Sequence, residues 1–297
     1  MPPVLAIIPA RYASTRLPGK PLLDRSGQPL IQHVVEAARA AERVTGVIVA
    51  TDDPRIRDAV VGFGGIAVMT AAEHPNGTAR IAEALTLLDP HPPGDAIVVN
   101  VQGDEPDVEP RLIDALVDTL IADADAPMAT LASPFADDED PQSEHIVKLV
   151  TTAVEPRRAL YFSRRLIPFV RSEARGGRSE ERGAGSEAGG AGSGVKPSHA
   201  AAKERLPGGD EAAGASPPLH TPRSSLLLKH PGLYAYRRDF LPVYAGLAPT
   251  PLEQAERLEQ LRALEHGYPI AVCVTPVRHH GIDTPEQYDA WLARQAR

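Results

Sequence analysis

Residues 4–22 read VLAIIPARYASTRLPGKPL and join a buried-strand pattern to a short cationic loop. The apolar run 4–9 is typical of a strand that is buried on both faces of a parallel sheet. Arg11, Arg16 and Lys20 follow it within one loop. Three cations so close together repel one another, which favours an anion among them, and arginine and lysine suit phosphate oxygens. A solvated basic loop is the alternative, and no G-x-x-x-x-G-K-[ST] pattern supports a P-loop nucleoside triphosphatase.

The rest of the chain alternates short apolar runs with segments of helical periodicity. Further strands are expected over 46–51, 66–70, 96–101, 128–133, 145–152, 229–237 and 270–275. Helices are expected over 30–41, 80–88, 111–122, 250–267 and 283–295. Thr250 and Glu253 form a capping-box pattern, and Gly267 lies past the end of that helix. This alternation predicts an α/β fold with a mostly parallel sheet covered on both faces, which binds ligands in loops at the carboxyl ends of its strands.

Composition limits the kind of protein. The chain has 297 residues, 42% of them hydrophobic, which is enough for a core, and a formal net charge of −8. An acidic balance disfavours a nucleic-acid or membrane-surface partner. The one cysteine, Cys273, cannot form an internal disulfide and lies in an apolar run typical of a core strand. No apolar stretch approaches about 18 residues and the start is not that of a signal peptide, so we expect a soluble, cytoplasmic protein.

Residues 172–225 differ from the rest of the chain. They hold 11 of the 24 glycines, and their larger apolar side chains are Val195, Leu206 and Leu219 alone. Burial of so little area does not offset roughly 1–2 kcal/mol of backbone ordering entropy per residue. We therefore expect a disordered low-complexity insertion within a single domain formed by 1–171 and 226–297. A regulatory or partner-binding segment is the alternative.

Deletion of residues 175–222 is accordingly expected to leave the melting temperature within a few degrees of that of the full chain. A thermal melt of both proteins measures this. A collapse in stability would show that the insertion packs against the domain.

Two aspartates are candidate ligands of a hard cation. Asp104 lies in VNVQGDEP (99–106), just past a predicted strand, where a Mg²⁺ ion between protein and phosphate would be held. Asp283 precedes the last predicted helix and would add a second oxygen ligand. Helix or turn capping is the alternative for both carboxylates. The adjacent His279 and His280 invite a zinc hypothesis, but they lack a third ligand at the usual spacing.

Other polar residues stand at the ends of predicted elements. The stretch HPNGTARIAEAL (74–85) puts Thr78 and Arg80 at a helix start, a geometry that binds anions. Arg164 follows the segment ALYFS, and His230 lies in a predicted strand, where a lone histidine is more often structural.

These pieces, in this order, resemble one family. The stretches IIPARYASTRLPGKPL, VATDD, NGTARIAEAL, IVVNVQGDEP, VKLV, ALYFSRRLIPF, KHPGLYAYRRDFL, TPLEQAERLEQLRALEHGYPIAV and GIDTPEQYD are similar to those of the 3-deoxy-manno-octulosonate (Kdo) cytidylyltransferases. The match spans nearly the whole chain outside 172–225. The sequence departs from the family pattern at Ala79, where an acidic residue is usual.

The resemblance implies a Rossmann-like, three-layer α/β/α nucleotidyltransferase fold with a predominantly parallel mixed sheet and a smaller extension for dimerisation and sugar binding. It implies that CTP and Kdo react to give CMP-Kdo and pyrophosphate, with Mg²⁺ as cofactor, for the lipopolysaccharide core. It also implies a homodimer.

The same resemblance assigns roles to individual residues. The catalytic group would be Arg16, Lys20, Asp104 and Asp283, of which Asp104 and Asp283 would bind the metal. The nucleotide would be bound by Pro9, Ala10, Arg11, Arg16, Lys20, Thr78, Arg80 and Gln102. The sugar acid would be bound by Arg164, His230, Tyr234, Glu259 and Gln260.

Two other functions stay open from sequence. An amino-substituted Kdo or another sugar acid would need the same fold with a different acceptor, and turnover of CTP with each acid distinguishes them. A homologue that binds nucleotide without catalysis is disfavoured, because a pure binder has no need of paired metal carboxylates beside Lys20.

Overall fold

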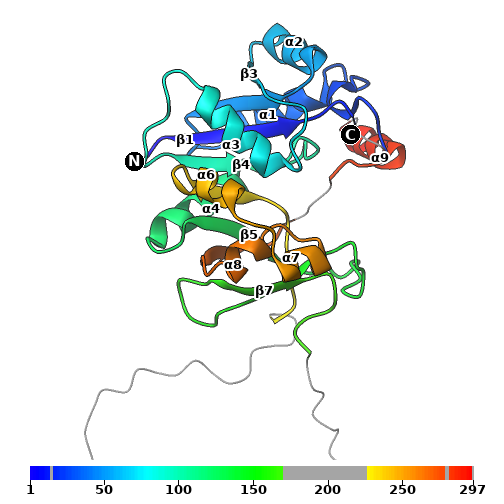
Figure 1. Cartoon of the computed structure of the whole chain (residues 1–297). Helices are drawn as coiled ribbons and strands as arrows, with labels where there is room; N and C mark the ends of the chain where they lie inside the picture. The colour runs from blue at the N-terminus through cyan, green and yellow to red at the C-terminus, as the bar shows by residue number, and fades with distance from the viewer. Residues whose placement is uncertain (14–15, 170–225, 278–280, 296–297) are drawn as a thin grey trace, which may run out of the picture. The chain divides into compact units, whose positions relative to one another are not determined.

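A mixed sheet of ten strands organises the part of the chain that the structure describes, which comprises residues 1–13, 16–169, 226–277 and 281–295 of a computed structural model (Figure 1). The strands are β1 (Val4–Ala10), β2 (Gly46–Thr51), β3 (Ile66–Met69), β4 (Ile97–Asn100), β5 (Met128–Pro134), β6 (Lys148–Thr151), β7 (Ala159–Ser163), β8 (Leu228–Lys229), β9 (Tyr234–Arg237) and β10 (Ile270–Val274). The helices are η1 (Lys20–Leu22), α1 (Leu30–Arg39), α2 (Pro54–Gly62), α3 (Gly77–Leu87), α4 (Pro110–Ala122), α6 (Phe240–Gly246), α7 (Pro251–Glu256), α8 (Leu261–Glu265) and α9 (Pro285–Gln295).

The strand order is β3-β2-β1-β4-β9-β5-β8-β6-β7, and β10 pairs with β5. β3, β2, β1 and β4 are parallel neighbours. β9 then runs antiparallel to both β4 and β5, and β8, β6 and β7 continue as antiparallel pairs. The predicted, predominantly parallel sheet is therefore confirmed for the half that carries the N-terminal loop, and an antiparallel extension follows it.

Helices cover both faces of the sheet, as predicted. Along β1, Ala6 and Ile8 pack into one core with α1, α2 and α4, whereas Ile7 faces a second core with α3, α6 and α8. Alternate side chains of a strand point to opposite faces, so an uninterrupted apolar strand needs cover on both. The three-layer α/β/α fold is confirmed.

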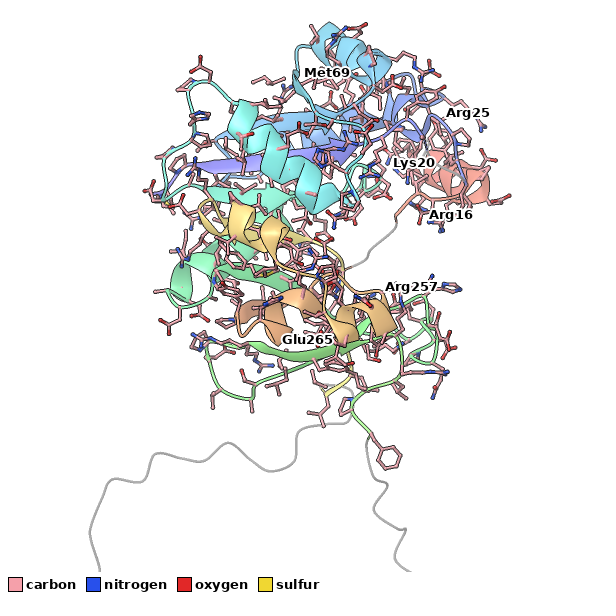
Figure 2. The ribbon with its side chains drawn as sticks, in the orientation of Figure 1. Arg16, Lys20, Arg25, Met69, Arg257 and Glu265 are labelled. Carbon is pink, nitrogen blue, oxygen red and sulfur yellow. The ribbon has the colours of Figure 1, made fainter. Side chains whose placement is uncertain are left out.

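The single helix predicted over 250–267 is wrong, because the chain forms α7 and α8 with a break between them. Arg257 ends α7 in the left-handed region, at φ 53°, and Figure 2 labels it on that helix. Glu253 of α7 makes a bidentate ion pair with Arg262 of α8. In one continuous helix these two side chains, nine residues apart, would point in opposite directions. Because of the break, Glu259 and Gln260 lie between the two helices and not on one face of a continuous helix.

The strand predicted over 229–237 is also wrong, because Pro231 and Gly232 divide it into β8 and β9. The strand predicted over 145–152 is confirmed only as the shorter β6. α2, α6 and β7 were not predicted. The insertion 172–225 lies outside the described residues.

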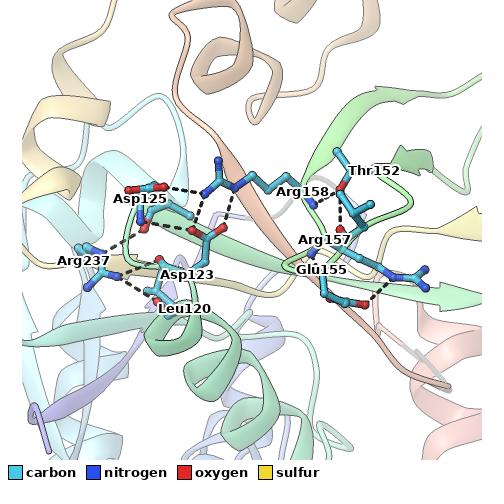
Figure 3. Close-up of polar contacts among 10 residues, drawn as sticks. Leu120, Asp123, Asp125, Thr152, Glu155, Arg157, Arg158 and Arg237 are labelled. Carbon is cyan, nitrogen blue, oxygen red and sulfur yellow. Dashed lines mark hydrogen bonds and ion pairs between the residues drawn. The ribbon is translucent and has the colours of Figure 1, made fainter. Parts of the chain in front are cut away.

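An ion pair joins the C-terminal end of α4 to the connection between β6 and β7 (Figure 3). The Asp123 side chain, 2% exposed, accepts from Arg158 Nε at 2.7 Å and from another guanidinium nitrogen at 2.6 Å. These hydrogen bonds hold the pKa of Asp123 below its usual value of 3.8. Arg237 donates to the carbonyl oxygens of Leu120 and Asp123. The pair therefore stabilises the junction of the parallel and antiparallel halves.

Replacing Asp123 by asparagine is expected to lower the free energy of unfolding by about 2–4 kcal/mol, because the Arg158 guanidinium, whose side chain is 32% exposed, loses the buried carboxylate that pairs with it. The carboxylate stabilises the fold above pH 3.8 and ceases to do so as acid protonates it. The difference between wild type and variant should thus shrink below that pH. Urea unfolding at about pH 7 and about pH 3 measures both effects. Asp125→Asn, with an 85% exposed side chain, is the control and should change little.

No helix among the described residues combines the length and the apolar character that crossing a membrane requires.

Candidate active site

The loop after β1 and the turn after β4 lie together at the carboxyl edge of the sheet. β1 and β4 are parallel, with Ile7 paired to Asn100, so both chains leave the sheet at the same edge. A Cβ atom at Gly103 would lie 2.9 Å from the Pro9 carbonyl oxygen, so only glycine allows this approach. The close approach brings Asp104 within reach of the cationic loop.

Lys20 joins the two aspartates that were predicted as metal ligands. Its ammonium donates to Asp104 Oδ2 at 2.9 Å and to Asp283 Oδ1 at 3.1 Å. The two carboxylate oxygens therefore lie no farther apart than the sum of these distances. The Lys20 side chain is 13% exposed, and Figure 2 shows it beside α9.

Asp283 reaches this position because the start of α9 binds to the turn after β4. The backbone amide of Ile282 donates to the carbonyl oxygen of Asp104 at 2.9 Å. The Arg16 guanidinium contacts Asp283 Oδ2 at 2.9 Å. The four residues predicted as catalytic thus form one cluster of two cations and two carboxylates.

The loop itself is held by Tyr12. The amide of Gly19 donates to the Tyr12 carbonyl oxygen at 3.0 Å, and the Arg55 guanidinium lies 3.4 Å from the centre of the Tyr12 ring. Asp53 orients Arg55 through two side-chain contacts. Gly19 adopts φ 69°, a left-handed conformation that favours glycine, and η1 follows at once with Lys20.

The donor set fits a magnesium ion. Mg²⁺ takes one or two carboxylates and completes its shell with water and phosphate oxygens, and Asp104 and Asp283 provide that number. Burial, and to a lesser extent the neighbouring Asp104, raise the pKa of Glu105 to about 8, so Glu105 is mostly protonated at neutral pH and is a poor ligand for a metal ion. The described residues hold no group of three or more His, Cys, Asp or Glu side chains suited to a metal. His279 and His280, on which the zinc hypothesis rests, lie outside them.

The residues predicted to bind the nucleotide gather around the end of β1. Ala10 is buried there, and a Cβ atom at Gly77 would lie 3.0 Å from the Pro9 ring. Arg11 donates to two backbone carbonyls in the segment before α3. Gln102 follows β4 and donates to a side-chain oxygen on that strand. The structure thus brings them together, and their binding of a nucleotide stays a prediction.

Arg80 lies fully buried on α3, which is rare for a cation. It donates to Thr70 Oγ1 at 2.6 Å and approaches Asp52 Oδ1 at 3.1 Å, but its Nε has no hydrogen-bond partner in the described structure. Burial lowers the pKa of the guanidinium, and Arg11 lowers it further. Asp52 is the carboxylate that pairs with Arg80. Sequence reasoning missed this role, although the stretch VATDD contains the residue.

Thr78 connects the predicted nucleotide and sugar groups. Its side chain lies beside the carboxylate of Glu259: burial raises the pKa of Glu259, and the Thr78 hydroxyl partly offsets that rise. Thr78 is buried at the start of α3, and Glu259 lies in the break after α7. The helix that we expected over 250–267 gave no indication of this contact.

The other predicted sugar contacts lie near Glu259. His230 Nε2 is 2.9 Å from Thr130 Oγ1, and its ring lies 5.3 Å from that of Tyr234. Burial raises the pKa of Tyr234, and Glu259 adds to the shift. Gln260 is 4% exposed, and its Nε2 has no partner among the described residues. A buried amide without a partner is costly, and a ligand oxygen would satisfy it.

Arg164 lies at the end of β7, apart from this aromatic group. Its Nε donates to the carbonyl oxygen of Glu256 at 3.0 Å, and a terminal nitrogen donates to that of Glu144 at 3.2 Å. A cavity of about 780 Å³ joins it to the metal-ligand cluster, and its lining includes Arg16, His145, Arg164, Asp283, Gln287 and Arg294. Three arginines against one carboxylate suit an acidic ligand.

Known proteins resemble this chain over nearly its full length. The family model described as cytidylyltransferase matches residues 5–270. The 3-deoxy-manno-octulosonate cytidylyltransferase of Syntrophobacter fumaroxidans is 44% identical over 287 residues, which cover 97% of this chain and 94% of the relative. That of Geobacter metallireducens is 42% identical and covers 99% of this chain and 98% of its own.

Solved structures agree with the sequence relatives. The structure of CMP:2-keto-3-deoxy-manno-octonic acid synthetase complexed with CTP is similar at a TM-score of 0.75 and 36% identity, covering 99% of this chain and 98% of that one. A 4-diphosphocytidyl-2C-methyl-D-erythritol synthase from Anaerococcus prevotii, at 11% identity and a TM-score of 0.54, shares the fold alone. The chain therefore belongs to the cytidylyltransferases and, within them, to the 3-deoxy-manno-octulosonate cytidylyltransferase family.

Proposed function

We propose that this protein transfers CMP from CTP to Kdo and releases pyrophosphate. The observation that carries the proposal is the Lys20 ammonium shared by Asp104 and Asp283 beside Arg16. Cations and paired carboxylates at one sheet edge are what a metal-bound triphosphate requires. The names of the relatives, and the CTP in the similar solved structure, support the choice of substrates.

In this mechanism the protein positions the reactants and stabilises charge. Arg11, Arg16 and Lys20 bind the triphosphate, so that the α-phosphorus faces the sugar hydroxyl in line with the departing pyrophosphate. Asp104 and Asp283 would hold Mg²⁺, which neutralises charge on the phosphate oxygens when bound.

The sugar acid is bound on the other side of the reacting phosphate. His230, Tyr234, Glu259 and Gln260 would contact its hydroxyls, and Arg164 its carboxylate. The proximity of Thr78 to Glu259 supports this arrangement, because it places the two substrate regions next to each other. No covalent nucleophile is needed, and the pKa of the Cys273 thiol is raised by burial, which makes it a poor one.

Release of pyrophosphate from CTP across a panel of sugar acids tests the proposal. Kdo should give the highest kcat/KM in the presence of Mg²⁺. A higher value with an amino-substituted Kdo or another sugar acid would transfer the assignment to that acid, and no release with any acid would refute it.

We further propose that the enzyme works in the cytoplasm as a homodimer and supplies CMP-Kdo for the lipopolysaccharide core. β7 at the edge of the sheet leaves Leu160 59% exposed, and Leu252 on α7 is 40% exposed. Such apolar side chains suit a contact between two copies. Light scattering on the eluting protein should give twice the chain mass, and a monomer at working concentration would contradict it.

A further inference from the structure

The last helix, α9, packs onto the site through a small core of its own. Trp291, the only tryptophan in the chain, is fully buried in it, next to Tyr288, Ile282, Leu30 and Leu17. Leu17 belongs to the cationic loop, between Arg16 and Lys20. The packing of α9 and the position of that loop therefore depend on the same few side chains.

One carboxylate binds the C-terminal part of α9. Asp107 Oδ1 accepts from Trp291 Nε1 at 2.8 Å and from Gln295 Nε2 at 3.1 Å, and its Oδ2 pairs with Arg294 at 3.2 Å. The indole can donate only one hydrogen bond, and its buried nitrogen gives it to Asp107. These three contacts restrict both the translation of the helix along its axis and its rotation about that axis.

Asp107 belongs to the turn between β4 and α4 that also carries Asp104, three residues earlier. The same turn accepts a hydrogen bond from Ile282, just before α9 begins, through the Asp104 carbonyl oxygen. The turn thus holds α9 at both ends. Asp283, at its beginning, is placed opposite Asp104 by these two attachments.

We propose that Asp107 is a positioning residue that sets the separation of Asp104 and Asp283 by anchoring Trp291. This rests on the proposed function, in which those two carboxylates share a metal. Partners of this kind, which hold ligands without touching the metal, typically change metal affinity roughly 10- to 100-fold when lost. A second ion pair of α9, between Arg25 and Asp289, is more than half exposed at both side chains and contributes little.

The test compares Asp107→Ala with Asp114→Ala. Asp114 is the matched control, since its carboxylate accepts from the backbone amides of Glu42 and Arg43 on another side of α4. One readout is acrylamide quenching of the single tryptophan, which reports whether α9 stays packed without any substrate or metal. The other is the Mg²⁺ concentration that gives half-maximal turnover.

Asp107→Ala should increase quenching and raise the half-saturating Mg²⁺ concentration about tenfold or more. Asp114→Ala should change neither. Asp107→Asn keeps an oxygen that accepts from the indole and should restore most of both. Trp291→Phe keeps the packing but loses the donor, so it should raise the Mg²⁺ requirement as Asp107→Ala does, and the double variant should add nothing.

Unchanged quenching in Asp107→Ala would overturn the anchoring, and unchanged Mg²⁺ dependence in both Asp107→Ala and Trp291→Phe would overturn the positioning role. If Asp107→Ala does not fold, Trp291→Phe and Asp107→Asn decide the matter alone. Failure of the proposed metal site is distinguishable, because Asp104→Ala and Asp283→Ala would then leave the Mg²⁺ dependence unaltered.

Discussion

Replacing Asp104 by alanine is expected to abolish CMP-Kdo formation without unfolding the protein, and Asp283→Ala should do the same. Each change removes one of the two carboxylates that Lys20 brings together. Metal stabilisation of a phosphoryl transition state contributes several kcal/mol, so a loss of at least about a thousandfold in kcat/KM is expected. Both side chains are partly exposed, at 30% and 39%, so the core is untouched.

Turnover at saturating CTP and Kdo, with circular dichroism on the same samples, measures this first prediction. Asp289→Ala is the matched control, since it removes an exposed carboxylate from the same helix, α9, as the one that Asp283 precedes. It should retain wild-type turnover. Undiminished turnover of Asp104→Ala or Asp283→Ala at ordinary Mg²⁺ would remove that residue from the metal site.

Changing Lys20 to methionine is expected to raise the KM for CTP roughly 10- to 100-fold and to affect Kdo much less. Methionine keeps the apolar stem of this nearly buried side chain but loses the charge, and charged hydrogen bonds contribute about 1.5–3 kcal/mol. The loss has a second component, because Asp104 and Asp283 then repel each other with no ammonium between them. That repulsion should make binding of CTP more dependent on Mg²⁺.

Steady-state kinetics with each substrate varied in turn measures this second prediction. Arg25→Met serves as the control, because it removes a nearby cation that pairs only with the exposed Asp289 among the described carboxylates. It should leave both KM values unchanged. A larger change for Kdo than for CTP in the Lys20 variant would contradict the assignment of Lys20 to the triphosphate.

Much of the fold followed from local patterns. The apolar runs that became β1, β2, β4, β5 and β10 are buried on both faces. Nearly every residue of such a strand is apolar, so the run is easily told from the polar and turn residues that flank it. The meeting of the loop after β1 with the turn after β4 followed from the parallel sheet. The strand pattern accounts for Lys20 and Asp104, whereas Asp283, which precedes the last helix, was grouped with them by the resemblance to the cytidylyltransferases.

The features that were missed depend on contacts between distant residues. The break between α7 and α8 is set by an ion pair of Glu253 with Arg262 and by a left-handed Arg257, neither of which changes the apolar periodicity. Asp52 and Asp107 were passed over for a related reason. Their partners, Arg80 and Trp291, are far away in the sequence, and an aspartate next to another acidic or polar residue gives no local sign of its partner.

The most direct test of the central claim is a crystal structure with CTP and Mn²⁺ in place of Mg²⁺, in which anomalous scattering locates the metal. The account predicts a peak about 2 Å from carboxylate oxygens of both Asp104 and Asp283, with Lys20 turned to the triphosphate. A metal bound to CTP with neither carboxylate in its coordination shell would contradict it.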